Sequence, residues 1–319
     1  MRFVIVGTGA LGSILGAHLI HAGHEVTLVA RGKRAEGLRR DGLRLTGLAS
    51  LALPCHVVDA VSDLAATDTL VVATKAIATA TTLAALRHVR LDSAFSVQNG
   101  VLKNELLAAA FGRERVLGCM ADVSGELLPD GTVKFTRNVG LHLGELGAVS
   151  SERARGLAAA FEAAGIRSAV APNIVTREWS KFAGWIAQLP LAVLTRRLTH
   201  EFLSDPSAAA VIVPIAREAK ALADAAGITL EDAPPLPVAS MAQGTDAEAA
   251  ELVFAVAKRY RDTAPEHRMS AQQDALRASP LELEETLGFA LRRAGELGVP
   301  MPTLATCYRI LRASYPKQG

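Results

Sequence analysis

The sequence has few cysteines and few aromatic side chains, and its charges are balanced. Cys55, Cys119 and Cys307 lie far apart and show no CxxC or Cys/His spacing. We therefore expect neither a disulfide framework nor a zinc site, and we predict no metal ligands. Lysine and arginine number 34 against 32 aspartate and glutamate, for a net charge of +2. Because no basic stripe or tail is present, nucleic acid is not an expected partner.

Long apolar runs are also missing. Residues 182–194 form an apolar stretch, but they include Gln188 and Pro190 and are too few to span a bilayer. Residues 3–20 resemble the apolar part of a signal peptide. We interpret them instead as part of a folded unit, because they carry three glycines in a fixed pattern and a second strand follows. The sequence therefore predicts a cytoplasmic protein without a membrane partner.

The composition is that of a folded globular protein. Half of the residues are hydrophobic (50%) and 21% are charged, which is the profile of a chain with a packed core rather than of a disordered or fibrous one. A length of 319 residues is too great for one ordinary domain and suits two, each with a sizeable core.

Strand-like and helix-like segments alternate in the first part of the chain. Residues 11–21 have a helical pattern closed by Ala22-Gly23. The runs with strand character are residues 3–6, 25–30, 55–58, 69–73 and 94–97. Such alternation is typical of a parallel sheet that helices cover on both faces.

The pattern changes after Val116. Residues 132–135 and 139–143 follow the turn Asp130-Gly131 and predict short antiparallel strands added to the sheet edge. One helix after Ser151 and a short strand at 167–171 come next. Beyond residue 173 the pattern is helical, at residues 179–194, 205–226, 246–261 and 280–297. We place the domain boundary near residue 170.

A glycine-rich motif, Gly7-Thr8-Gly9-Ala10-Leu11-Gly12, directly follows the first strand and opens the first helix. The first glycine allows the tight turn, the second lets a pyrophosphate approach the backbone, and the third permits close helix packing. The helix N-terminus adds free N–H groups and the positive end of the helix dipole. The alternative is a glycine-rich turn without a ligand. We predict an α/β fold, with a Rossmann dinucleotide-binding domain at residues 1–170 and an all-helical substrate and catalytic domain at residues 171–319.

The end of the second strand distinguishes NADP from NAD. An NAD site has an acidic residue there to accept from the ribose hydroxyl, whereas this chain has Ala30-Arg31, with Lys33 and Arg34 close behind. Cationic side chains suit the 2′-phosphate of NADP. We therefore expect NADP (NADPH) as the cofactor, with Arg31 on the phosphate; the alternative is a solvated basic loop.

Two further polar segments follow strands of the predicted sheet. Lys75 comes after the strand at 69–73, and Gln98-Asn99-Gly100 comes after the strand at 94–97. Ligands bind at the carboxyl ends of such strands. We expect Lys75 and Asn99 to lie at a ligand-binding site. An exposed loop lysine and an ordinary turn are the alternatives.

Lys181 lies near the start of a predicted helix that is otherwise strongly apolar. Burial lowers the pKa of a lysine, which suits it to polarise a carbonyl and then to donate a proton. The alternative is a lysine whose ammonium group reaches solvent along an apolar stem.

Glu282 and Ser270 also have both structural and chemical interpretations. Ser279-Pro280-Leu281-Glu282 fits a capping box with proline at the first helical position. Ser270 suits the N-cap of a short helix that runs through Asp274. Either geometry would account for the residue without any chemistry.

Together these residues resemble the ketopantoate reductase (2-dehydropantoate 2-reductase) family, over essentially the whole chain. The segments that carry the resemblance are Gly7-Thr8-Gly9-Ala10-Leu11-Gly12, Arg31, Ala73-Thr74-Lys75-Ala76, Gln98-Asn99-Gly100, Trp179-Ser180-Lys181-Phe182, Ser270-Ala271-Gln272-Gln273-Asp274, Glu282 and Gly288. The resemblance implies NADPH-dependent reduction of 2-dehydropantoate on the route to coenzyme A.

The resemblance also implies roles for individual residues. It makes Lys181 the general acid, Glu282 the carboxylate that orients the lysine and the reacting hydroxyl, and Ser270 a contact for the substrate carboxylate. It puts Asn99 and Lys75 between nicotinamide and substrate. These roles agree with the chemistry, since hydride addition to a ketone builds negative charge on its oxygen, which a nearby ammonium stabilises.

The chain departs from the family pattern at the expected substrate amides. Trp185 and Leu189 stand at two positions after Lys181 where the family has asparagine. His267, three residues before Ser270, and Leu287, directly before Gly288, also stand where the family has asparagine. We count Trp185, Leu189 and His267 as substrate-binding positions. A site that lacks these amides fits a less polar 2-oxo acid; the alternative is a pocket that reaches ketopantoate through other contacts.

Two other functions remain open at this point. One is a regulator that binds NADP(H) without chemistry, and the other is a neighbouring type of two-domain dehydrogenase acting on 3-hydroxy acids or opines. The expected partner is a small-molecule 2-oxo acid. The sequence leaves the oligomeric state open, with a homodimer among the alternatives.

Overall fold

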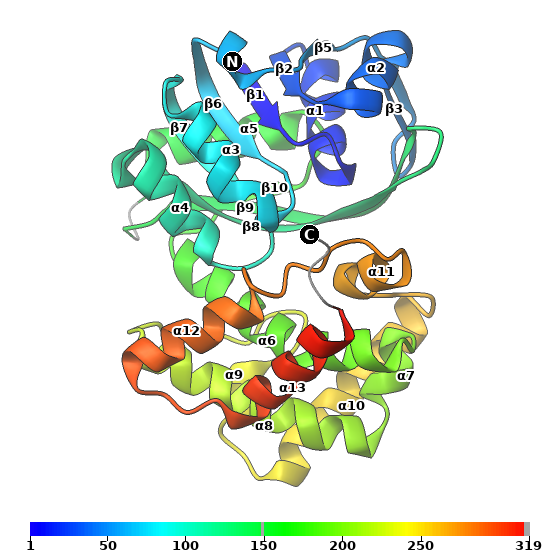
Figure 1. Ribbon diagram of the computed structural model, residues 1–319, viewed down its shortest axis with the longest axis vertical. Coiled ribbons are helices and arrows are strands. Elements are labelled where there is room, and N and C mark those ends of the chain that lie inside the picture. The colour runs from blue at the N-terminus through cyan, green and yellow to red at the C-terminus, as the bar shows by residue number, and fades with distance from the viewer. Residues whose placement is uncertain (148–149, 316–319) are drawn as a thin grey trace. The chain divides into compact units, whose positions relative to one another are not determined.

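The computed structural model describes residues 1–147 and 150–315. The chain divides into two compact units, Met1–Val175 and Thr176–Gly319, where the sequence suggested a boundary near residue 170. The N-terminal unit is α/β with a parallel sheet, and the C-terminal unit is helical throughout its described part (Figure 1). The predicted fold class is therefore confirmed.

The parallel sheet contains five strands in the order β5-β2-β1-β6-β7. Their bounds are His56–Val58, Glu25–Val29, Arg2–Val6, Ala66–Val72 and Arg90–Ser96. The central strand β1 is buried on both faces. Phe3 and Ile5 belong to one hydrophobic core and Val4 and Val6 to the other, because successive side chains of a strand point to opposite faces.

Helices cover both faces of this sheet. The core around Phe3 also includes side chains of α1 (Ala10–His21) and α5 (Glu152–Ala163). The opposite core includes side chains of α3 (Thr79–Leu86) and α4 (Leu102–Phe111). Helix α2 (Gly32–Asp41) packs along β5. Three short 3-10 helices complete the helical elements described in this unit: η1 (Val61–Asp63), η2 (Ala76–Ala78) and η3 (Arg113–Arg115).

A second sheet lies on the far side of α1, and it corrects the prediction of short strands at the edge of the first. Strands β8 (Leu117–Leu127) and β9 (Val133–Glu145) form a long antiparallel pair. On its other edge β9 pairs in parallel with β3 (Leu43–Gly47) and β10 (Ser168–Val170), and β4 (Leu51–Leu53) pairs with β3.

The two predicted segments at 132–135 and 139–143 are thus one strand. The intervening residues are polar, which hid its continuity from the hydrophobic pattern, but β8 pairs along them with register shifts at Asp122/Val123 and Ser124/Gly125. Such bulges let a strand continue with a change of twist.

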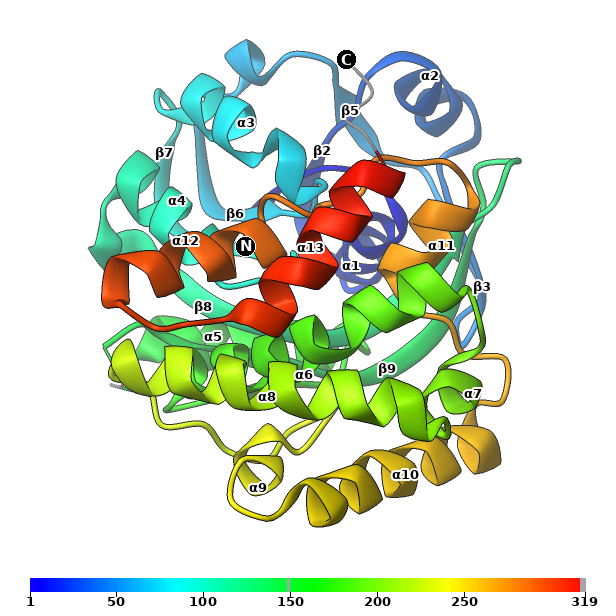
Figure 2. The same cartoon turned by 60° about the horizontal axis from the view of Figure 1, so that its bottom comes forward.

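The C-terminal unit has no strand among residues 176–315. Figures 1 and 2 show its helices, which are α6 (Ile174–Thr195), α7 (Thr199–Leu203), α8 (Pro206–Ala225), α9 (Val238–Met241), α10 (Asp246–Thr263), α11 (Ser270–Leu276), α12 (Leu287–Leu297) and α13 (Pro302–Ser314). In the described part of the chain, no helix has the length and apolar character needed to cross a membrane.

Capping residues explain where several of these helices begin. Thr245 and Glu248 form a capping box at the start of α10, and the Asp205 side chain caps α8 before Pro206. The predicted helix at 280–297 begins only at Leu287. The capping box suggested for Ser279 to Glu282 is therefore wrong, because residues 279–282 are not helical.

Candidate functional site

The glycine motif forms the loop between β1 and α1. Gly7 has φ +102°, and a Cβ there would lie 2.5 Å from the backbone nitrogen of Thr74. A Cβ on Gly12 would lie 1.9 Å from the carbonyl oxygen of Gly7. Both glycines are thus required by packing.

Gly9 differs from these two glycines. No atom lies within 4 Å of the position that its Cβ would take, and the residue is the N-cap of α1 without a side-chain cap. The helix start therefore offers its N–H groups beside open space, where a Cβ would intrude. This cradle fits the pyrophosphate of a dinucleotide.

Basic side chains follow β2 but fall into two groups. Arg31, the N-cap residue of α2, and Lys33 are exposed. Arg34, which we expected beside them on a phosphate, is half-buried and donates to Thr8, Ser13 and Gly131. Its burial is the main cause that lowers the pKa of this guanidinium from its ordinary value.

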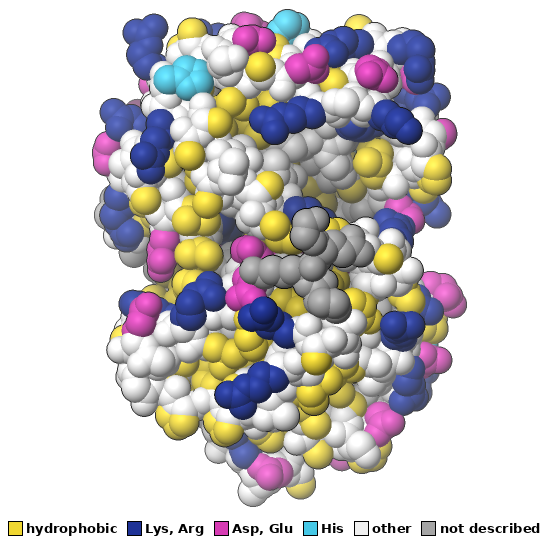
Figure 3. Space-filling view, in the orientation of Figure 1, with side chains coloured by type: hydrophobic (Ala, Val, Ile, Leu, Met, Phe, Trp, Pro, Cys, Tyr) yellow, Lys and Arg dark blue, Asp and Glu magenta, His cyan; other side chains and the backbone are white. Residues whose placement is uncertain are grey.

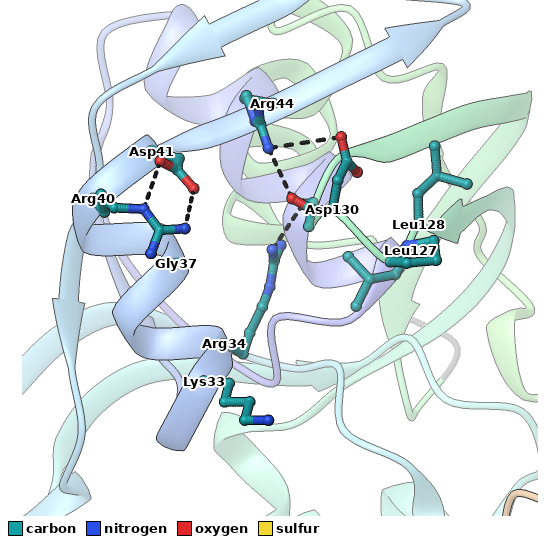
Figure 4. A pocket seen from close by; sticks show the side chains of 12 residues that line it. Lys33, Arg34, Gly37, Arg40, Asp41, Arg44, Leu127, Leu128 and Asp130 are labelled. Carbon is teal, nitrogen blue, oxygen red and sulfur yellow. Dashed lines mark hydrogen bonds and ion pairs between the residues drawn. The ribbon is translucent and has the colours of Figure 1, made fainter.

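Figure 4 shows Arg34 directed from α2 toward the turn between β8 and β9. Lys33 and Arg44 lie on the same cavity of about 270 Å³, together with Leu127 and Asp130. Across the face seen in Figure 3, basic side chains are interspersed with acidic ones.

The loops that carry Lys75 and Asn99 are tied together by Gln98. Its amide nitrogen donates to the Thr74 carbonyl over 2.8 Å and to the Thr79 hydroxyl over 2.6 Å. Lys75 is exposed and Asn99 is half-buried, immediately before Gly100 with φ +89°. Both residues therefore lie at the carboxyl edge of the parallel sheet, next to the glycine loop that contacts Thr74.

Lys103 is a buried residue near this edge that sequence reasoning missed. This lysine is only 6% exposed, and its ammonium donates to the carbonyls of Gln98 over 3.0 Å and Cys119 over 2.5 Å. In the sequence it stands among Asn104 and Glu105 and resembles an ordinary surface charge.

In the C-terminal unit, Lys181 lies two turns inside α6 rather than at its start, and it is half-buried. The two residues next to Lys181 in the sequence pack against other parts of the unit. Ser180 accepts from the backbone nitrogen of Glu231 over 2.9 Å, and the ring of Phe182 meets that of Phe289 with centroids 6.2 Å apart. The lysine is thus a charged residue on a largely buried helix.

Trp185 and Gln188 follow Lys181 on the same face, since about 3.6 residues make one turn. Trp185 is 8% exposed, Gln188 1% and the neighbouring Leu189 1%. The Oε1 atom of Gln188 has no hydrogen-bond partner among the described residues. A buried amide oxygen is costly without a donor, which makes Gln188 a functional candidate that the sequence reading passed over.

Ser270 begins the short helix α11, and Glu282 follows this helix in the chain. Ser270 is exposed and is the first residue of α11; the N-cap is Met269, and no side chain caps this end. The N-cap interpretation of Ser270 is therefore wrong. Glu282 is half-buried, and its backbone carbonyl accepts from the Thr286 hydroxyl over 2.5 Å.

His267 has structural partners. Its ring stacks on that of Tyr260, with centroids 4.6 Å apart, and its Nδ1 lies 2.9 Å from the Thr199 hydroxyl. The side chain thus joins the segment before α11 to α7 and α10. In the described parts of the chain, no three His, Cys, Asp or Glu side chains are grouped to hold a metal ion.

Comparison with known proteins identifies relatives of both units. The family model "Ketopantoate reductase PanE/ApbA" matches residues 3–148, and its C-terminal counterpart matches residues 173–315. A 2-dehydropantoate 2-reductase of Archaeoglobus fulgidus is 29% identical over 312 residues, covering 98% of this chain and 97% of that protein.

Solved structures agree with this match. A PanE/ApbA family ketopantoate reductase from Ralstonia eutropha superposes with a TM-score of 0.84 and 25% identity, over 100% of this chain and 99% of its own. A D-mandelate dehydrogenase with NADH and anilino(oxo)acetate has a TM-score of 0.85 over 99% of this chain and 98% of its own. At 19% identity, the second likeness is evidence of the fold alone.

Proposed function

The chain belongs to the ketopantoate reductase family, and we propose that it reduces a small 2-oxo acid to the 2-hydroxy acid with NADPH. The family consists of oxidoreductases that act on a CH–OH group with a nicotinamide dinucleotide. The observation that carries the proposal is the half-buried Lys181 on the otherwise packed helix α6. In this proposal residues 1–170 bind the cofactor and residues 171–319 bind the substrate.

NADPH rather than NADH is proposed from the surroundings of Arg31. This side chain is exposed and makes no hydrogen bond or ion pair within the described residues. A guanidinium at the end of β2 complements a 2′-phosphate. The motif Gly7-Thr8-Gly9-Ala10-Leu11-Gly12 would hold the pyrophosphate, and Lys75 and Asn99 would flank the nicotinamide.

When bound, NADPH supplies the hydride for the carbonyl carbon of the substrate. As negative charge builds on the carbonyl oxygen, the ammonium of Lys181 stabilises it and then transfers its proton to that oxygen. Glu282 orients the lysine and accepts from the product hydroxyl, and Ser270 donates to the substrate carboxylate. Glu282 lies five residues before the start of α12 at Leu287.

A less polar 2-oxo acid than ketopantoate is a second candidate substrate. Trp185 and Leu189 are buried apolar side chains on the helix that carries Lys181, at positions where the family has amides. The side chain of His267 is already bonded to Thr199 and stacked on Tyr260. Gln188, a buried amide on the same helix, is a candidate to replace them.

The experiment is a panel of 2-oxo acids with NADPH, repeated with NADH. The panel includes ketopantoate, branched aliphatic and aromatic 2-oxo acids. We expect turnover with at least one of them, and a preference for NADPH. Binding of NADPH without turnover of any 2-oxo acid would favour a non-catalytic regulator, and oxidation of a 3-hydroxy acid alone would favour the neighbouring dehydrogenases.

The variant Trp185→Asn separates the two substrates. It restores an amide at the first family position, so the ratio of kcat/KM for ketopantoate to that for the apolar acids should rise. A wild-type enzyme that already prefers ketopantoate, and that Trp185→Asn does not improve, would exclude the less polar substrate.

A further inference from the structure

The carbonyl oxygen of Thr8, inside the glycine motif, is held by two side chains. The Nε of Arg34 donates to it over 3.0 Å, and the hydroxyl of Ser13 donates to it over 3.1 Å. A second nitrogen of Arg34 donates to the Ser13 hydroxyl over 2.8 Å. Arg34, Ser13 and the Thr8 carbonyl are thus each bonded to the other two.

This arrangement fixes the direction of the peptide unit between Thr8 and Gly9. In a trans peptide the C=O and N–H groups point in opposite directions. Because Arg34 and Ser13 hold the carbonyl, the N–H of Gly9 is directed away from them. No atom lies within 4 Å of the position that a Cβ of Gly9 would take.

Arg34 itself is fixed by a third contact. Its remaining terminal nitrogen donates to the Gly131 carbonyl over 2.8 Å, in the turn between β8 and β9 (Figure 4). That turn is braced, since the Asp130 carboxylate accepts from the Thr132 backbone and hydroxyl, both over 2.9 Å. The Asp130 carbonyl also accepts from Arg44 over 2.8 Å. The guanidinium therefore bridges this hydrogen-bonded turn and the glycine loop.

We propose that Arg34 is a positioning residue for the cofactor pyrophosphate, which acts through Ser13 and the Thr8 carbonyl to present the Gly9 N–H group. This inference rests on the proposed binding of a dinucleotide at the loop. It separates Arg34 from Arg31, although both follow β2. Arg31 acts on the 2′-phosphate, which NADH lacks, whereas Arg34 acts on the pyrophosphate, which NADPH and NADH share.

The test is the dissociation constant of each nucleotide, measured by fluorescence titration without any substrate. Arg34→Met should weaken NADPH and NADH by the same factor, about tenfold, because the Gly9 N–H group loses its fixed direction toward a pyrophosphate that both nucleotides carry. Arg31→Met should weaken NADPH and leave NADH unchanged. Arg39→Met is the matched control on α2, because Arg39 pairs with Asp59 at the surface; it should change neither constant.

Two more variants test alternative explanations for a loss of affinity in Arg34→Met. One explanation is that the variant does not fold, and the other is that only the positive charge of Arg34 matters. Ser13→Ala keeps the arginine, and it should weaken both nucleotides by a smaller common factor, with little further loss when combined with Arg34→Met. Arg34→Lys keeps the charge but not the fork of donors, so it should behave like Arg34→Met. Retention of full affinity by Arg34→Lys would overturn the positioning role.

If Arg34→Met or Ser13→Ala weakens NADPH alone, or neither nucleotide, the inference is wrong while the proposed reduction stands. If the wild-type protein binds neither nucleotide, the inference and the proposed function fail together. Circular dichroism of each variant shows whether the compared proteins are folded.

Discussion

The buried ammonium of Lys103 donates a hydrogen bond to the backbone carbonyl of Gln98 over 3.0 Å. The same ammonium donates to the carbonyl of Cys119 in β8 over 2.5 Å. Gln98 in turn donates to the Thr74 carbonyl over 2.8 Å. One series of contacts thus joins β8 to the loops after β6 and β7, including the loop that carries Asn99.

Replacement of Lys103 by methionine should destabilise the fold. The substitution keeps the apolar stem but leaves the carbonyls of Gln98 and Cys119 without this donor, at a cost of about 2–4 kcal/mol. Urea unfolding measures the change. Lys220→Met is the control, because Lys220 forms a surface pair with Asp224 and should cost about 0.5 kcal/mol or less. Equal effects of the two substitutions would contradict the role of Lys103.

Substitution by glutamine should affect stability at Glu248 and turnover at Glu282. Glu248 accepts from the backbone nitrogen of Thr245 over 2.7 Å in the capping box of α10, so Glu248→Gln should lower stability modestly and leave turnover unchanged. Glu282 is proposed to orient Lys181 and to accept from the product hydroxyl, so Glu282→Gln should lower kcat by about 10²-fold or more. Thermal melting and steady-state kinetics on the two variants check both statements.

A result in which Glu282→Gln lowers the melting temperature but not kcat would remove Glu282 from the chemistry. Unchanged affinity for NADPH in both variants is the internal control, because neither carboxylate belongs to the cofactor-binding residues.

His18 should make stability depend on pH. Its Nδ1 lies 2.7 Å from the Ala164 carbonyl, and burial is the largest cause that lowers the pKa of this imidazole below its ordinary value of 6.5. The unfolded chain therefore binds a proton near pH 6.5 that the folded chain binds only at lower pH. By linkage, the stability from neutral His18 is present above about pH 6.5 and is lost as the pH falls below it.

Melting temperatures at pH 7.5 and 5.5 test this dependence. The loss on acidification should be smaller in His18→Gln than in the wild type, while the exposed His56, replaced in the same way, should leave the loss unchanged. An equal loss in wild type and His18→Gln would mean that other groups carry the acid sensitivity.

The sequence predicted the parts of this fold that depend on local patterns. The alternation of apolar runs and helices, and the glycine motif after β1, were enough to predict a parallel sheet that helices cover. The second sheet was missed because β9 crosses a polar stretch around Arg137, which pairs with Asp122 of β8. That pairing is not local in the sequence.

The directions of side chains, and the start of one helix, could not be predicted from the sequence either. Arg31 and Arg34 look alike as two cations after a strand, yet one is exposed and the other bridges two loops. Ser279 and Glu282 have the spacing of a capping box, but the helix begins five residues beyond Glu282, at Leu287. Packing of the surrounding chain, rather than the motif itself, decides both cases.

The central claim is that Lys181 donates the proton in the reduction of a 2-oxo acid by NADPH. The most direct test is a single-turnover measurement with NADPH bound to the wild type and to Lys181→Met, mixed with the best 2-oxo acid of the panel. We predict that nucleotide affinity is retained while the rate of NADPH oxidation falls by about 10²–10⁴-fold, the usual size of a general-acid contribution. Oxidation of NADPH at the wild-type rate in Lys181→Met would contradict the account.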